Sequence, residues 1–247
     1  MNTRIIKLSL SLFAALITSN SWANDPAVIL QAADRYRLAN ENSEIQSLIT
    51  TFLRDGSQEK ERQYLVYAQA NRQSLVVMQS PAEKGQKVLM SGDDFWIILP
   101  GSQRPMRITP MQKLVGDASI GDVATLNWSQ DYQAQLVGEE KCAEQACLHL
   151  SLSANRKSAA YQKIELWVSK QKFQPLSADL YVQSDKLAKH AIFVLDKNHP
   201  DQIEAMILQD KLSNHKETRI RYLQRKARTV PENWLNPMYL AKTSNLE

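Results

Sequence analysis

The strongest constraint on the fold of this chain is a long series of short β-forming runs, about a dozen in all. In most of them apolar and polar residues alternate, as in strands that bury one face, and turn residues bound each run. The candidate strands are Ile45–Leu53, Arg62–Ala68, Ser74–Gln79, Gln86–Met90, Phe95–Leu99, Pro105–Ile108, Gln133–Val137, Leu148–Leu152, Lys163–Val168, Leu176–Val182, Ala188–Leu195, Ile203–Leu208 and Thr218–Leu223. Short connections join them, which predicts an antiparallel meander. A flat sheet of this size is unusual, so we expect the meander to curl or close.

Helical signals are confined to three segments. "DPAVILQAADRYRLAN" has Asp25 as an N-cap, Pro26 at the first helical position and an imperfect apolar stripe. The segment Thr109–Leu126 predicts two short turns of helix broken at Gly116, and "PENWLNPMYL" predicts a short C-terminal piece. The sequence therefore predicts a mainly β chain, of the α+β type with little helix.

The first 23 residues have the features of a secretory signal peptide. Arg4 and Lys7 precede the apolar stretch "LSLSLFAALI", and Ser21 and Ala23 occupy the small-residue positions before a cleavage site. The apolar stretch is about ten residues, whereas a membrane-spanning helix needs about 20. No cysteine lies near the cut to accept a lipid anchor. We therefore predict cleavage after Ala23 and a soluble periplasmic protein.

The segment 24–247 shows no linker, low-complexity stretch or internal repeat, and it is of a size that single all-β domains commonly reach. We predict one domain and a monomer. Loss of the two basic residues of the signal peptide lowers the formal net charge of the 247-residue chain from +4 to +2. This charge is not typical of a nucleic-acid-binding protein, so we expect no nucleic-acid partner.

The two cysteines, Cys142 and Cys147, lie between the alternating runs "DYQAQLVG" and "CLHLSLS". Those runs predict two strands, with the cysteines at the turn between them. Export would carry both thiols into an oxidising compartment, where disulfides persist. We predict a structural disulfide. The alternatives are a redox pair, which would need C-x-x-C, and a metal site, which would need a further ligand nearby.

The stretch "SGDDFWIILPGSQRPMRI" pairs two unlike strands. Phe95 to Leu99 is apolar at every position, which is expected of a strand with both faces removed from water, while the following strand alternates Met106 and Ile108 with arginines. Two interpretations fit. The run either packs wholly as ordinary core, or it packs on core with one face and lines a cavity with the other, with Met106 and Ile108 turned inward.

Several segments in a fixed order resemble the outer-membrane lipoprotein-sorting protein family, whose fold is similar to that of the periplasmic lipoprotein carrier LolA. These segments are "AVILQAADRYR", "SPAEKGQKVLMSGDDFWIILP", "RPMRITPMQKLVGDASIGDV", "YQKIELWV", "MILQDKLSNHKETRIRY" and "NPMYL". The most specific part is the block Ser80–Val123. The resemblance implies a half-open antiparallel β-barrel of about eleven to thirteen strands, with short helices as a lid over an apolar cavity.

From this resemblance we expect a non-enzymatic carrier that needs no cofactor and takes acyl chains of lipoproteins or free lipids toward the outer membrane. The candidate cavity residues are Phe95, Ile97, Leu99, Met106, Ile108, Met111, Leu114 and Ile120. Gly116 and Gly121 are candidate hinge positions in the lid. The resemblance also implies a transporter of the resistance-nodulation-division type as a partner. An accessory protein of such an exporter, binding a hydrophobic substrate or a protein, is the alternative.

Basic residues near these segments have two interpretations. Arg104, Arg107 and Lys113 either bind a lipid head group or an acidic partner, since a guanidinium fits phosphate, or form a solvated rim. The run "RIRYLQRKAR", residues 219–228, is either an exposed strand face or a point of transient contact with an anionic membrane.

Signals for an enzyme are weak. The four histidines are scattered without metal-ligand spacing, and H-E-x-x-H, G-x-S-x-G and Gly-rich phosphate loops are absent from the sequence. Asp93 and Asp94 follow Gly92 and are more simply explained as a hairpin turn than as an acid/base pair. A lipid-modifying enzyme and a scaffold that binds only another envelope protein remain as further hypotheses.

Overall fold

The computed structural model describes residues 25–38, 40–124, 127–210, 213–243 and 246. The predicted signal peptide lies outside these residues. The strands are β1 (Ser43–Leu53), β2 (Gln58–Gln69), β3 (Gln73–Met78), β4 (Lys87–Ser91), β5 (Asp94–Ile98), β6 (Met106–Ile108), β7 (Lys113–Val115), β8 (Ala118–Ser119), β9 (Tyr132–Cys142), β10 (Gln145–Ala154), β11 (Lys163–Ser169), β12 (Pro175–Tyr181), β13 (Leu187–Leu195), β14 (Ile203–Gln209) and β15 (His215–Ala227). The helices are α1 (Pro26–Arg37), η2 (Pro81–Glu83), α2 (Ile120–Ala124), η3 (Glu232–Leu235) and α3 (Pro237–Lys242).

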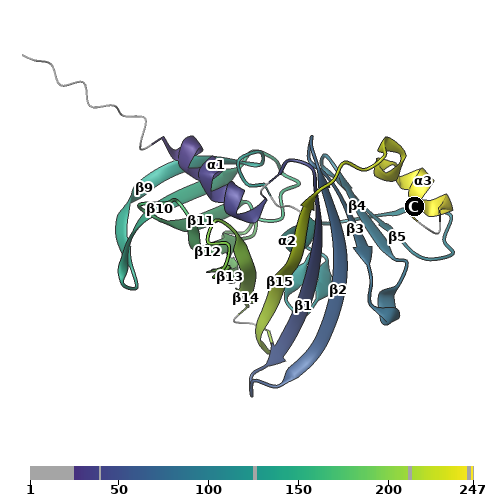
Figure 1. Ribbon diagram of the computed structural model, residues 1–247, viewed down its shortest axis with the longest axis horizontal. Helices are drawn as coiled ribbons and strands as arrows, with labels where there is room; N and C mark the ends of the chain where they lie inside the picture. Colours follow the sequence, from purple (N-terminus) through teal and green to yellow (C-terminus); the bar gives the residue numbers. More distant parts are fainter. Residues whose placement is uncertain (1–24, 39, 125–126, 211–212, 244–245, 247) are drawn as a thin grey trace, which may run out of the picture.

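Thirteen strands form one antiparallel sheet in the order β6-β5-β4-β3-β2-β1-β15-β14-β13-β12-β11-β10-β9. Every neighbouring pair is consecutive in sequence except β1 and β15, which pair at the centre from Ser43↔Ala227 to Leu53↔His215. The sheet curves strongly and does not close, because β6 and β9 are its two edges (Figure 1). The predicted half-open barrel and all thirteen of its predicted strands are confirmed.

Alternation of side chains sorts each strand into an inner and an outer face. In β11, Ile164, Leu166 and Val168 belong to the main core inside the curve, whereas Glu165 and Trp167 lie on the opposite face. Helix α1 covers the inner side next to β9, where Ile29, Leu30 and Ala33 are buried (Figure 1). The Asp25 carboxylate accepts a hydrogen bond from the Ala27 N–H, as the predicted N-cap requires.

Strand β5 is covered on both faces, although not as predicted. Phe95 and Ile97 pack toward the main core, while Trp96 and Ile98 belong to a second apolar cluster on the outer face. The C-terminal segment supplies the cover for this second cluster through Trp234 and other side chains of η3 and α3, at the opposite end of the molecule from β9 (Figure 1). The second apolar face of the strand therefore faces the C-terminal helices, and on the first face Phe95 borders the two open spaces described below.

The connection from β6 to β9 folds inside the curve of the sheet. Its first part is the β7–β8 hairpin, so the predicted helical turn before Gly116 is wrong. Helix α2 follows with all five residues buried. Local sequence did not reveal the hairpin, because its two strands have only three and two residues.

The two glycines of this connection are closely packed, which contradicts the predicted hinge. Gly116 has φ +56°, and a Cβ atom there would lie 2.2 Å from Thr51 Cγ2 and 2.6 Å from Thr218 Oγ1. A Cβ atom at Gly121 would lie 2.7 Å from the Cβ of Ala160. Both glycines allow close approach of backbone to neighbouring strands and loops.

We expect Gly116→Ala to lower the free energy of unfolding by about 2–5 kcal/mol, because left-handed strain and overpacking add. Urea denaturation measures this loss. Gly56→Ala is the matched control, since Gly56 has φ +87° and a Cβ atom there would meet nothing within 4 Å. Gly56→Ala should lower the free energy of unfolding only by the backbone strain, about 1–2 kcal/mol. Equal losses in the two variants would contradict the close packing at Gly116.

Candidate functional site

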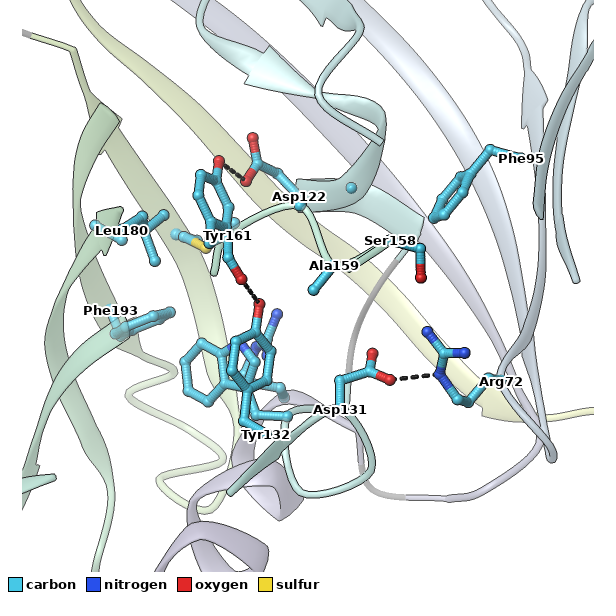
Figure 2. Close-up of a pocket in the computed structure, with 16 residues that line it drawn as sticks. Arg72, Phe95, Asp122, Asp131, Tyr132, Ser158, Ala159, Tyr161, Leu180 and Phe193 are labelled. Carbon is cyan, nitrogen blue, oxygen red and sulfur yellow. Dashed lines mark hydrogen bonds and ion pairs between the residues drawn. The ribbon is translucent and has the colours of Figure 1, made fainter. Parts of the chain in front are cut away.

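The interior of the curved sheet holds a small cavity of about 30 Å³. Its walls come from both arms of the sheet, with Phe95 on one side and Leu180 and Phe193 on the other (Figure 2). A volume of this size holds only one or two waters. The interior is therefore nearly filled in this conformation.

A much larger groove of about 450 Å³ lies at the open side of the sheet. We call it the entrance groove. Its apolar lining comes from Phe95, Ile108 and Met111 and from Ala159 and Ala160. Polar side chains at the groove include Asp93, Asp94, Arg107, Lys157, Gln162 and Gln183.

The loop between β10 and β11, residues 155–162, separates the two spaces. Ser158, Ala159 and Ala160 line both the cavity and the entrance groove, and so does Phe95. These three loop residues are small and only partly buried. We call this loop the partition.

Ion pairs at the open side join the two arms of the sheet, and Arg156 ties the partition to them. Arg72, from the β2–β3 turn, pairs with Asp131 (Figure 2). It also pairs with Asp93 at 2.7 Å. Arg156 of the partition lies 3.5 Å from Asp93 and 4.0 Å from Asp131. The Asn155 N–H donates to the Asp131 carbonyl at 2.8 Å. The two arms of the sheet are thus joined by opposite charges at the mouth.

The two carboxyl groups at the mouth differ in their environments. Hydrogen bonding from Arg72 lowers the pKa of the exposed Asp93 carboxyl. Burial raises the pKa of Asp131, and this effect exceeds the opposing attraction of Arg72. Asp131 therefore depends on its arginine partner to remain charged inside the protein.

A second polar cluster anchors the far end of the partition to α2 and β13. Tyr161 Oη donates to Asp122 Oδ1 at 2.7 Å, and Lys189 Nζ lies 2.6 Å from Asp122 Oδ2. The Ser119 N–H and hydroxyl both donate to Asp122 Oδ2 at 2.8 Å. Tyr132 Oη donates to the Tyr161 carbonyl at 2.9 Å (Figure 2). Burial opposes ionisation of Asp122, but Lys189 and these donors outweigh it and lower the pKa of the carboxyl.

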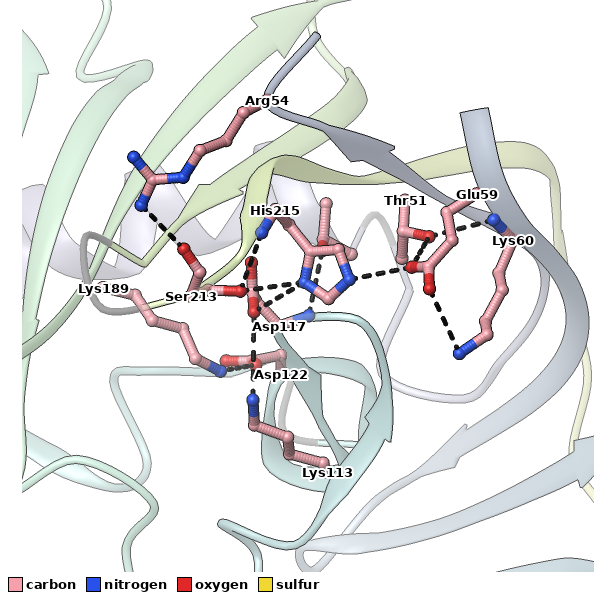
Figure 3. Close-up of polar contacts among 11 residues, drawn as sticks. Thr51, Arg54, Glu59, Lys60, Lys113, Asp117, Asp122, Lys189, Ser213 and His215 are labelled. Atoms are coloured by element: carbon pink, nitrogen blue, oxygen red, sulfur yellow. Dashed lines mark hydrogen bonds and ion pairs between the residues drawn. The ribbon is translucent and has the colours of Figure 1, made fainter. Parts of the chain in front are cut away.

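A third cluster ties the β7–β8 hairpin to the sheet. His215 Nδ1 lies 3.2 Å from Asp117 Oδ1 and 2.8 Å from Ser213 Oγ, while its Nε2 lies 2.8 Å from Glu59 Oε2 (Figure 3). The Asp117 N–H donates to Thr218 Oγ1 at 2.9 Å. Burial disfavours the His215 cation, but hydrogen bonds to Asp117 and Glu59 exceed this effect and raise its pKa.

The structure brings together only part of the predicted cavity set. Phe95, Ile108, Met111 and the predicted rim residue Arg107 line the entrance groove. Arg107 is exposed, pairs with Asp94 at 2.9 Å and lies over the Trp96 ring at 4.6 Å.

The other predicted residues lie elsewhere. Ile97, Leu114 and Ile120 pack in or against the main core and line neither space, and Leu99 is partly buried outside both. The prediction that Met106 turns inward is wrong: it is 47% exposed, because β6 is a three-residue edge strand. Arg104 and Lys113 are exposed, and Lys113 Nζ lies 3.9 Å from Asp117.

Sequence reasoning missed the polar clusters that close the site. One signal was present: in "LAKHAIFVL" Lys189 alternates in phase with Ala191 and Phe193, which places an ammonium group on the buried face. Arg72, Asp131 and Tyr161 lie in turns and loops, where alternation gives no direction.

The predicted disulfide is confirmed, with Cys142 and Cys147 bonded at a Cα–Cα distance of 5.8 Å. In the described part of the chain no grouping of His, Cys, Asp or Glu is suited to hold a metal ion. Among the described helices, none has the length and apolarity needed to cross a bilayer.

Comparisons with known proteins agree on the fold. A family model described as "-like: Uncharacterized protein" matches residues 70–242. A search of curated proteins finds no match. A crystal structure of a LolA superfamily protein from Nitrosomonas europaea is 28% identical, with a TM-score of 0.78 over 85% of this chain and 97% of that one.

Two further solved structures show the same fold at lower identity. A putative outer membrane lipoprotein-sorting protein domain from Vibrio parahaemolyticus is 18% identical, with a TM-score of 0.70 over 89% of this chain and 99% of that one. A DUF1329 family protein from Desulfovibrio piger is 21% identical, with a TM-score of 0.68 over 86% and 98%.

We expect Asp122→Asn to lower the free energy of unfolding by about 3–5 kcal/mol, because it leaves the Lys189 ammonium buried without a counter-charge. Adding Lys189→Met removes that charge and should restore part of the loss. Urea denaturation of the single and double variants measures both effects. A double variant no more stable than Asp122→Asn would show that the ion pair is not the source of the cost.

The raised pKa of His215 predicts a stability that depends on pH. Because folding favours the cation, the contribution is complete below the unfolded pKa of about 6.5 and is lost as pH rises through the folded pKa. Wild type should therefore exceed His215→Gln in stability more at pH 5.5 than at pH 8.5, as measured by chemical denaturation. A difference independent of pH would exclude this linkage.

Proposed function

Because this chain belongs to the LolA superfamily of outer-membrane lipoprotein-sorting proteins, we propose that it is a periplasmic carrier of acyl chains. The cargo is a lipoprotein or a free lipid, bound without covalent chemistry by a single domain and delivered toward the outer membrane. One observation carries the proposal: an entrance groove with an apolar floor lies directly against a nearly filled interior, and the two spaces share Phe95 and the small loop residues Ser158, Ala159 and Ala160 as lining.

Movement of the partition is the step that admits the acyl chain. Displacing Ser158, Ala159 and Ala160 would join the entrance groove to the cavity, whose far wall includes Leu180 and Phe193. The chain would then enter past Phe95 and Met111 and extend toward that wall. This role replaces the predicted lid of Thr109–Leu126, since α2 is buried and its glycine is closely packed.

A nearly filled interior suits a carrier without cargo. A permanently open apolar cavity would expose surface that promotes aggregation. Among the ion pairs at the mouth, those of Arg156 involve the partition itself, and because Arg156 and Asp93 are both substantially exposed their pair is weak. The energy released when acyl methylenes are buried, about 0.8 kcal/mol each, can offset the loss of such pairs.

Location in the periplasm is supported by the disulfide, because such bonds persist in oxidising compartments. The predicted signal peptide would direct export. Arg107 and Lys157, at the entrance groove, are suited to contact the polar end of the cargo.

The proposal is tested with a fluorescent long-chain acyl probe. Wild type should bind it saturably, and Met111→Gln should weaken binding about ten- to hundredfold, because a buried methionine contributes about 1.5–3 kcal/mol. Met238→Gln is the matched control, since Met238 is half exposed on α3, away from the entrance groove. It should bind the probe as wild type does.

Two results would refute the proposal. The first is absence of saturable probe binding by folded wild type. The second is wild-type affinity in a Met111→Gln variant whose circular dichroism shows a native fold, since the entrance groove would then not be the acyl site.

A further inference from the structure

A second groove of about 450 Å³ lies on the outer face of the sheet, opposite the acyl site. We call it the outer groove. It runs from the tip of the β9–β10 hairpin, at Cys142 and Gln145, to Asp179 on β12 and His190 on β13. The neighbours of these last two residues, Leu180 and Ala191, point the other way into the core. The outer groove therefore shares no wall with the cavity or the entrance groove.

Trp167 of β11 supplies the aromatic surface of the outer groove. One face of its ring stacks on His149 of β10, with centroids 4.6 Å apart and planes 18° apart. Its other cross-strand neighbour is Ser177 on β12, which lines the groove. The second face of the indole is thus directed toward the groove, while its Nε1–H donates to Glu140 Oε2 at 2.9 Å.

Three carboxylates, those of Glu140, Glu165 and Asp179, lie on this outer face, and two of them, Glu140 and Asp179, line the groove with Trp167. His149 lies 2.8 Å from both Glu140 and Glu165, and His190 lies 2.6 Å from Asp179. Glu165 and Asp179 are direct cross-strand partners, and like charges in that arrangement destabilise a sheet. Lys163, 3.3 Å from Glu165, and the histidines beside Glu165 and Asp179 lie close enough to counter this repulsion. The groove lining holds two carboxylates, Glu140 and Asp179, and one lysine, Lys141.

The shape of the outer groove is fixed before any partner arrives. The disulfide between Cys142 and Cys147 closes the hairpin tip that forms one wall. Hydrogen bonds hold both Trp167 and the Glu140 carboxylate. A preorganised site loses less conformational entropy on binding.

We propose that the outer groove binds an arginine side chain of a partner protein. A guanidinium stacks on an indole face and presents five N–H donors in a plane, which matches one open ring face with carboxylates beside it. Tryptophan and arginine are the side chains that most often dominate protein interfaces, which favours a protein over a small ligand. This surface is independent of the acyl site.

The test uses acetyl-arginine amide and follows the Trp167 indole N–H by NMR, with Trp167→Leu to assign the signal. We expect a saturable shift with this probe and none with acetyl-citrulline amide, which has nearly the same shape without the charge. Asp179→Asn should weaken binding about tenfold. Glu144→Gln, an exposed hairpin residue that does not line the groove, should leave it unchanged.

Three outcomes would overturn the proposal. These are no saturable shift with the arginine probe, an equal shift with citrulline, or a saturable shift only with a neutral sugar such as glucose. The arginine and citrulline comparison uses wild type and is decisive even if Asp179→Asn fails to fold. Acyl-probe binding should be unaffected by acetyl-arginine amide, so failure here is distinguishable from failure of the proposed carrier function.

Discussion

The buried pair of Asp122 and Lys189 is the interaction on which the rest of the architecture depends. A half-open sheet of thirteen strands cannot bury its inner face by closing, so a segment of the chain must fill the curve. Helix α2 does so, but five residues cannot hold it there by helix propensity alone. The ion pair joins α2 to β13, and the Tyr161 hydroxyl adds the partition to the same carboxylate. One charged group thus positions both the inner segment and the loop that limits access to the interior.

Charged side chains at the interior cavity have a consequence for the proposed cargo. Asp122 is matched by Lys189 and Asp131 by Arg72, while Arg37 lies over the Trp128 ring at 3.9 Å. The walls made by Phe95, Phe193 and their neighbours are apolar. Such an environment favours the uncharged part of a lipid in the interior and leaves its polar end at the groove, where side chains are solvated.

The outer face of the sheet differs between its two ends. Toward the β3–β5 end, the C-terminal segment packs Trp234 on the outer face. Toward the β9–β13 end, Trp167 and the carboxylates of Glu140 and Asp179 line an open groove on the outer face. Alternation within each strand allows one sheet to carry the proposed lipid site on its inner face and a separate polar surface on its outer face.

The sequence alone determined the β class, the thirteen segments that form the strands of the main sheet, the N-cap at Asp25 and the disulfide, because period-two alternation, capping residues and cysteine spacing are local signals. It also placed Phe95, Ile108 and Met111 at the candidate site. Only the tertiary structure decided that Ile97, Leu114 and Ile120 are core, because an apolar side chain looks the same in sequence whether it meets protein or open space. The clusters of Arg72 with Asp131 and of Asp122 with Lys189 join residues 59 and 67 positions apart, and nothing local encodes such a pairing. The curvature of the whole sheet brings these buried charges together with their partners. The contacts that close the site therefore depend on the tertiary structure.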